Sequence, residues 1–234
     1  KGDMTANVQA YKGDNALRNF FDVVGSFKRA SALQVVARAM HMYPHVRDQI
    51  LLQAAEFLSE YSLTVGSVWT GKTSLMIACE YEFPSLVGFL LSQARARDDA
   101  RAKAFEDMRL MNPGAIVPRQ SSLLRRMLRA RDNNGQTVFM KAADRVANLR
   151  LLIASAKDAF GDGAAADLLN VPDKDGSTPL IRAFDKRAIG NAKLLIANGA
   201  DVTVKKADGS TLLHNIEILG NLDAVNTIIG SLGV

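Results

Sequence analysis

The sequence has little cysteine, histidine or aromatic content, and each shortage excludes a class of structure. Cys79 is the one cysteine among 234 residues, so no disulfide can form within the chain. His41, His45 and His214 are not spaced from Cys79 in any recognised zinc-ligand pattern. We therefore expect a protein of a reducing compartment, in the cytoplasm, without a structural metal or any other cofactor.

Aromatic residues make up 6% of the chain, whereas Ala, Leu and Met are abundant, and this balance favours helices over sheets. No apolar run approaches the roughly 18 residues that a membrane span needs, and no secretory leader opens the chain. We expect a soluble protein without a transmembrane span. The chain begins at Lys1 rather than Met, which suggests a fragment of a longer protein or a processed form.

Positive charge is concentrated in one part of the sequence. The whole chain carries a formal charge of +5, but residues 95–131 alone hold ten Lys and Arg residues against four acidic ones. Such a segment attracts anionic partners, including acidic proteins, nucleic acids and anionic lipids. No other composition signal points to a partner class.

A motif near the C-terminus repeats. The residues from Asp175 to Leu180 read DGSTPL, the residues from Asp208 to Leu213 read DGSTLL, and the two glycines lie 33 positions apart. This motif and this period resemble the ankyrin repeat family. The resemblance implies an all-α solenoid of helix-turn-helix units joined by short, β-hairpin-like fingers.

Each part of the unit has a physical reason. Asp-Gly favours a tight turn, Thr178 can cap the first helix, and Pro179 suits the first helical position. A second helix is expected from Gly190 to Ala197, and Gly199 can end it. One unit leaves apolar faces uncovered on both sides, so neighbouring units must stack on it.

Further units are expected upstream, and residues 69–234 are predicted to form an ankyrin repeat domain. The predicted units span 69–94, 95–130, 131–172, 173–205 and 206–234. The 95–130 unit lacks the turn motif and is expected to hold one helix from Asp99 to Leu110 and another from Ser121 to Ala130. The glycine spacing across the 131–172 unit exceeds the 33-residue period by eight residues, so a surface loop or a lengthened second helix is expected near residues 155–165. Residues 1–68 are predicted to be α-helical, either as a cap on the stack, as a degenerate repeat or as a small separate domain.

Ankyrin repeats bind other proteins through turn tips and the exposed side of the first helices, so the resemblance implies a non-enzymatic scaffold that binds a partner protein in a concave groove. Transferring these positions to this chain gives three groups. The predicted tip residues are Asn133, Asn134, Gln136, Lys174, Asp175, Ser177, Lys206, Asp208 and Ser210. The predicted polar contacts on the first helices are Lys141, Arg182 and Asn215, and the predicted apolar anchors are Phe139 and Ile181.

Two alternatives use other residues. Arg125, Arg126 and Arg129 share one face of a predicted helix, opposite Leu124 and Leu128, and that face is either a solvated surface or an anion-binding strip for an adaptor. Residues 66–73 read GSVWTGKT, which matches the phosphate-binding loop of nucleotide hydrolases, with Lys72 as the phosphate contact. The preceding stretch is short and polar for a buried strand, which weakens the nucleotide alternative.

No paired carboxylates and no Ser/His/Asp set stand out, so we expect no enzyme and no small-molecule substrate. The departures from the repeat pattern and the long inserts also resemble ankyrin proteins that bacteria secrete into host cells as effectors.

Overall fold

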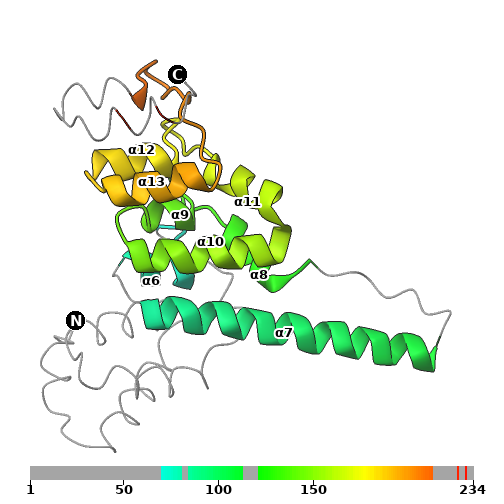
Figure 1. Cartoon of the computed structure of the whole chain (residues 1–234). Coiled ribbons are helices and arrows are strands. Elements are labelled where there is room, and N and C mark those ends of the chain that lie inside the picture. The colour runs from blue at the N-terminus through cyan, green and yellow to red at the C-terminus, as the bar shows by residue number, and fades with distance from the viewer. Residues whose placement is uncertain (1–69, 81–83, 113–120, 213–225, 227–229, 231–234) are drawn as a thin grey trace, which may run out of the picture.

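A computed structural model describes residues 70–80, 84–112, 121–212, 226 and 230. All the regular elements in these ranges are α-helices (Figure 1), which confirms the predicted all-α class. They are α6 (Ser74–Glu80), α7 (Pro84–Met111), α8 (Leu123–Arg129), α9 (Val138–Lys141), α10 (Val146–Phe160), α11 (Asp162–Leu169), α12 (Pro179–Asp185) and α13 (Ile189–Ala197). None of these helices combines the length and the apolar character needed to cross a bilayer. The helices predicted within residues 1–68, together with His41, His45, His214 and Asn215, lie outside the described residues.

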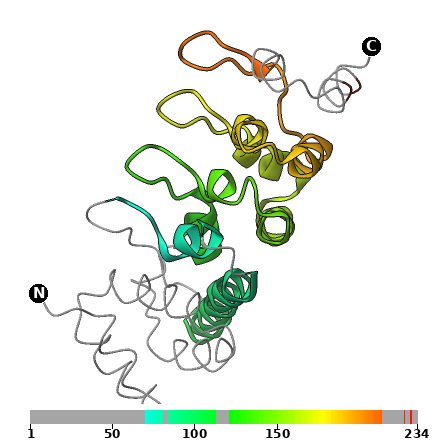
Figure 2. The ribbon, with the colours of Figure 1, turned by 90° about the vertical axis from the view of Figure 1, so that its left-hand side faces the viewer.

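The helices form two columns beside a row of loops. The first helices α6, α9 and α12 pack on one another in that order, and the second helices α7, α10 and α13 pack in a parallel column. Figure 2 shows the loops projecting from the side of the first helices, one above another. We call these loops fingers and define them as residues 70–73, 131–137, 172–178 and 205–211. The isolated bridges Arg131 to Thr137 and Lys205 to Thr211 close two of them as short hairpins.

The fingers are joined by one backbone hydrogen bond at each step. Asn133 N–H donates to Thr70 C=O at 3.0 Å, Lys174 N–H donates to Asn134 C=O at 3.1 Å, and Ala207 N–H donates to Asp175 C=O at 3.0 Å. The donor always lies two residues before the glycine of its finger, and the acceptor one residue before the glycine of the preceding finger. The finger of Gly71 is therefore the immediate neighbour of the finger of Gly135.

This ladder changes the interpretation of residues 95–130. The predicted separate helix from Asp99 to Leu110 is wrong, because α7 runs unbroken over 28 residues, about 42 Å at the usual rise. Its first part is buried on the stack and the rest projects beyond it (Figure 1). The helix predicted from Ser121 to Ala130 is present as α8. Helix α8 packs on both α7 and α10.

The insertion in the next unit is also helical. The lengthened second helix expected near residues 155–165 is confirmed, since α10 continues to Phe160, and after Gly161 the additional helix α11 follows. Gly161 adopts a φ of 82°, which allows the chain to turn sharply between the two helices. The additional residues of this unit therefore lie mainly in helices, and not in the surface loop that was the alternative.

The first helices begin as the sequence predicts. The hydroxyl of Thr178 accepts a hydrogen bond from Ile181 N–H, and Pro179 occupies the first turn. Thr73 and Thr137 occupy the same place before α6 and α9 and accept from Met76 and Met140 N–H. A threonine two residues after each finger glycine therefore starts every described first helix.

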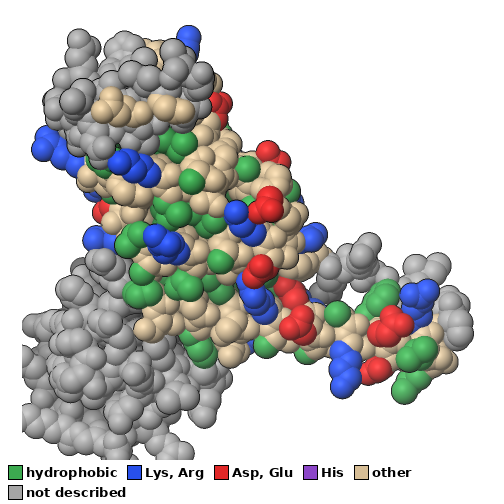
Figure 3. All heavy atoms as spheres, viewed as in Figure 1, with side chains coloured by type: hydrophobic (Ala, Val, Ile, Leu, Met, Phe, Trp, Pro, Cys, Tyr) green, Lys and Arg blue, Asp and Glu red, His purple; other side chains and the backbone are tan. Residues whose placement is uncertain are grey.

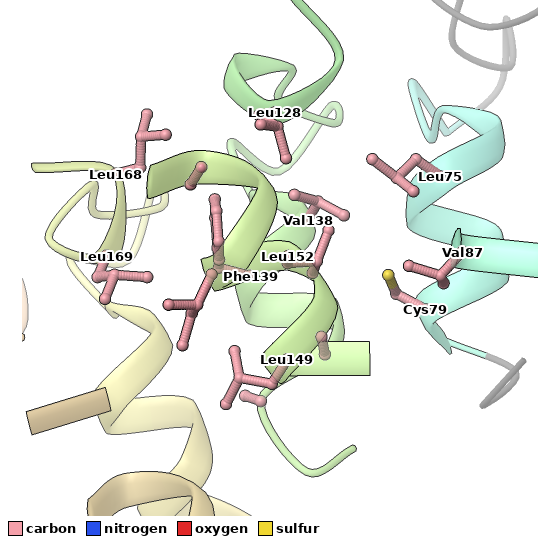
Figure 4. Packing of buried hydrophobic residues seen from close by; sticks show 14 of the residues in the cluster. Leu75, Cys79, Val87, Leu128, Val138, Phe139, Leu149, Leu152, Leu168 and Leu169 are labelled. Carbon is pink, nitrogen blue, oxygen red and sulfur yellow. The ribbon is translucent and has the colours of Figure 1, made fainter. Parts of the chain in front are cut away.

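The core lies between the two columns and continues from unit to unit (Figure 4). Leu75, Phe139 and Leu149 are fully buried there, and Val87 faces Cys79 across the first unit. Two buried asparagines link successive units. The Asn148 side-chain amide donates to Cys79 C=O at 3.2 Å, and that of Asn191 donates to Ala143 C=O at 3.0 Å, in each case at the end of the preceding first helix.

Candidate partner-binding surface

Two buried aspartates shape the fingers. One carboxylate oxygen of Asp132 accepts from Asn134 and Gln136 N–H, both at 2.9 Å, and one of Asp173 accepts from Asp175 and Ser177 N–H at 3.0 and 2.9 Å. The second oxygen of each carboxylate binds a cation on the following first helix, Lys141 at 2.9 Å and Arg182 at 2.7 Å. Both carboxylates are almost completely shielded from solvent. The second and third fingers are thus each held closed by a carboxylate that also fixes the finger to its own helix.

The environment of Asp173 favours its charged form. Burial acts to raise the pKa of this carboxyl, but the hydrogen bond from Arg182 and those from the Ser177 and Asp175 backbone outweigh burial, and the net pKa lies below its usual value. The fourth finger has a looser version of the turn. Asp208 accepts from the backbone and the hydroxyl of Ser210, which lowers the pKa of this exposed carboxyl.

Cations along the finger side of the first helices are paired within the protein. Besides the two pairs above, Lys72 binds Glu80 at 2.7 Å and Lys206 lies 3.6 Å from Asp185. In each of these four pairs a carboxylate lies beside the cation. This surface therefore has no large excess of either charge, and a strongly acidic partner gains no special attraction from it.

The predicted site residues differ in their exposure in the structure. Asn133, Asn134, Lys174, Asp175 and Asp208 are exposed at the finger tips, and Gln136, Lys141, Arg182, Lys206 and Ser210 are half-buried beside them. The prediction is wrong for Phe139, Ile181 and Ser177, which are 0%, 1% and 3% exposed. The two apolar side chains belong to the core between the helices, so neither can anchor a partner. Asn215 lies outside the described residues.

Sequence reasoning missed the groups that build this surface. Asp132 and Asp173 lie three residues before their finger glycines, and Asn148 and Asn191 lie near the starts of their second helices. The equal offset of the two aspartates is visible in the sequence and is the signal that was available. The asparagines are 13 and 15 residues after their glycines, so unequal turn lengths hide their equivalence.

Close packing of successive fingers makes a specific glycine necessary, which gives a testable prediction. Gly176 has a φ of 77°, and a Cβ built on it would lie 2.8 Å from Ala207 N in the next finger. Gly209 has a similar φ of 82° but open space around it. We expect Gly176→Ala to destabilise the protein by about 2 kcal/mol or more and Gly209→Ala by about 1 kcal/mol. Both changes place a side chain on a backbone with positive φ, which is strained, and only the new Cβ at position 176 also clashes with the next finger.

Urea unfolding of the two variants measures this difference. Equal losses in both variants would show that the fingers do not pack as closely as these distances imply.

The predicted arginine face lies on α8. Arg125, Arg126 and Arg129 are exposed, whereas Leu124 and Leu128 are buried, as the helical spacing predicts. Arg131 follows α8 but belongs to the second finger, where its guanidinium donates to Gly135 C=O and Pro172 C=O. The anion-binding role of the three arginines stays a prediction at this point.

The lysine of the phosphate-loop motif is paired within the protein. The Lys72 ammonium donates to both carboxylate oxygens of Glu80, at 2.9 and 2.7 Å. The residues from Gly66 to Trp69 lie outside the described part of the chain. The lysine that would contact phosphate is thus held at the C-terminal end of α6.

Cys79 is a core residue. It is fully buried in α6, and burial raises the pKa of its thiol far above the usual range. A thiol in this state is a poor nucleophile and a poor metal ligand. Within the described residues no group of acidic, histidine or cysteine side chains forms a metal-binding cluster.

The opposite face of the stack is different in character. Figure 3 views the second helices, where hydrophobic side chains gather over α10 and α13 with separate Lys and Arg side chains between them. The fingers and first helices thus carry paired charges and polar tips, and the second helices carry a more apolar surface. Polar tips on a backbone ladder are suited to side-chain recognition, and the finger side is the candidate surface for it.

Comparisons with known proteins agree with this repeat geometry. A family model described as ankyrin repeats in three copies matches residues 119–206. The B-cell lymphoma 3 protein homolog of Mus musculus is 25% identical over 161 residues, which cover 69% of this chain and 28% of that protein. A protein of Rickettsia bellii named as an ankyrin repeat protein is 34% identical over 97 residues, which cover 41% of this chain and 57% of that protein. The chain thus spans less than two thirds of the length of either relative.

Proposed function

We propose that this chain, which is an ankyrin repeat protein, holds a partner protein along the concave surface made by its fingers and first helices. Ankyrin repeats indicate a protein-interaction module, and we propose in addition that the partner contacts the finger tips and the first helices. The backbone ladder from Thr70 to Ala207 carries it, because this ladder fixes the spacing of the finger tips that a partner would contact.

The contacts are proposed at the exposed tips and not at the core residues beneath them. Asn133 and Asn134 offer side-chain amides in the second finger, and Lys174 and Asp175 offer opposite charges in the third. Lys141 and Arg182 are tied to Asp132 and Asp173, so they support the fingers and contact a partner at most through their exposed edges. A partner with mixed polar groups suits this surface better than a strongly acidic one.

The experiment compares two charge-matched double variants in affinity purification with mass spectrometry. Asn134→Arg with Ala207→Arg places two bulky cations at exposed finger positions, and Ala154→Arg with Ala197→Arg places two at exposed positions of α10 and α13. We expect the same proteins to be retained by the wild type and by the second variant and to be lost from the first, with melting temperatures unchanged. Loss from both variants alike, or from neither, would place partner binding elsewhere.

We further propose the organisation of the chain around this surface. Residues 69–130 form one unit with an inserted α8, residues 131–172 form a second with an inserted α11, and units follow at 173–205 and 206–234. Residues 1–68 are proposed as a helical cap or small helical domain. We also propose a scaffold without enzymatic activity in a reducing compartment, which the buried free thiol of Cys79 fits, with delivery into a host cell as one setting for it.

A further inference from the structure

Helix α8 lies between the second helices α7 and α10 in the sequence and packs on both. Its apolar side chains Leu123, Leu124, Met127 and Leu128 are all buried. Its N-terminus is fixed by Asp98 of α7, whose carboxylate accepts from Leu123 N–H at 2.7 Å, Leu124 N–H at 3.1 Å and the Ser122 hydroxyl at 2.6 Å. A short helix held in this way presents its outward side chains from a rigid base.

The outward side chains are arginines arranged around one aromatic ring. The guanidinium carbons of Arg125 and Arg129 lie 5.2 and 4.7 Å from the centroid of Phe160, at the end of α10. Arg125 Nε also donates to Ala159 C=O at 2.8 Å, which fixes the direction of that guanidinium. Cation-π contacts and this hydrogen bond restrict the side chains, so less rotamer entropy is lost when they bind a ligand.

Arg125 and Arg129 have no carboxylate partner among the described residues. Neither Arg125 nor Arg129 takes part in an ion pair there. On the finger side, by contrast, four cations each lie beside a carboxylate: Lys72, Lys141, Arg182 and Lys206. In the sequence, residues 119–131 contain five arginines and no acidic residue.

We propose that the arginine face of α8, centred on Arg125 and Arg129 beside Phe160, binds a phosphorylated segment of a protein. Guanidinium groups bind phosphate through paired, charge-assisted hydrogen bonds, and Nη1 and Nη2 of Arg125 remain for this after Nε has bound Ala159. Because α8 packs on the second helices, the surface is separate from the fingers and can be occupied together with them.

Two observations favour a phosphoprotein over single-stranded nucleic acid and over a membrane surface. Single-stranded nucleic acid binding uses exposed aromatic rings for base stacking, but the ring of Phe160 is already covered by the two guanidiniums. Membrane surfaces hold proteins through exposed apolar side chains as well as charge, but the apolar side chains of α8 are buried. A few fixed guanidiniums on a two-turn helix match the size of one or two phosphate groups.

The probe is a fluorescent peptide of three phosphoserines separated by glycines, compared with the same peptide containing serine. Fluorescence anisotropy should show binding of the phosphorylated form that weakens as salt is raised, and no binding of the serine form. Arg125→Gln with Arg129→Gln should weaken binding by about tenfold or more, the loss expected for two charge-assisted contacts. Arg129→Gln alone, which leaves the Arg125 to Ala159 bond in place, should weaken it by a smaller factor and keep the wild-type melting temperature.

Lys174→Gln with Lys205→Gln removes the same charge from the exposed fingers and serves as the matched control. The proposal holds if this control binds the phosphopeptide within about twofold of the wild type, since non-specific attraction depends on total charge alone. Equal losses in the two double variants would overturn it, as would absence of phosphopeptide binding. Tighter binding of a single-stranded oligonucleotide, or of vesicles containing 30 mol% phosphatidylserine, would overturn the assignment to a protein ligand.

Discussion

Replacing Phe139 with alanine is expected to lower the free energy of unfolding by about 4 kcal/mol, within the range typical of a fully buried phenylalanine. Phe139 is 0% exposed and lies in α9, between the first helices α6 and α12 that pack on either side. The deletion leaves a cavity where three units meet, and rigid helices on both sides cannot close it. Urea unfolding followed by circular dichroism measures the loss.

Phe139→Leu is the matched control for this change. Leucine fills most of the volume and keeps the site apolar, so the expected loss is about 1 kcal/mol. A binding measurement separates the role of Phe139 in the core from the partner contact that the sequence predicts for it. The leucine variant should bind a finger-side partner as the wild type does, and a large loss of affinity in that stable variant would restore Phe139 as a contact residue.

The repeated fold was predictable because its signals are local. A turn glycine with positive φ, a threonine cap and a proline at the first helical position each act within a few residues, and together they place α12 correctly. The length of α7 was not predictable in the same way. Five of the twelve residues 99–110 are Ala or Arg, which suit a helix, and no local signal indicates that this helix continues α7 instead of starting a new unit.

The site was harder to predict because exposure depends on tertiary packing. The family pattern places Phe139 and Ile181 near the groove, but the first helices here are only four and seven residues long and their apolar side chains are all used between neighbours. Arg182 looks like a free contact in the sequence, and only the folded finger brings Asp173 to 2.7 Å from it. Charge pairs between finger and helix depend on the turn geometry, which single residues do not reveal.

Replacing Asp173 with alanine is expected to lower the free energy of unfolding by about 3 kcal/mol. The change removes the acceptor for Asp175 and Ser177 N–H and leaves the half-buried Arg182 without its carboxylate. Asp173→Asn should cost less, about 1.5 kcal/mol, because an amide oxygen can still accept from the turn while the ion pair is lost. Asp175→Asn, at an exposed tip of the same finger, should change stability by less than about 0.5 kcal/mol and is the matched control.

The pH dependence of stability tests the electrostatic part of this account. The pKa of Asp173 is lower in the folded protein than in the unfolded chain, where about 3.9 is usual, so the stabilisation is complete above that value and is lost as pH falls through the folded pKa. The destabilisation measured for Asp173→Asn relative to the wild type should therefore be full at pH 6 and shrink steadily below about pH 4. Because other carboxylates titrate equally in both proteins, the difference isolates this residue. A gap between the two proteins that stays constant down to pH 2 would show that the carboxylate acts through the shape of the turn, and not through its charge.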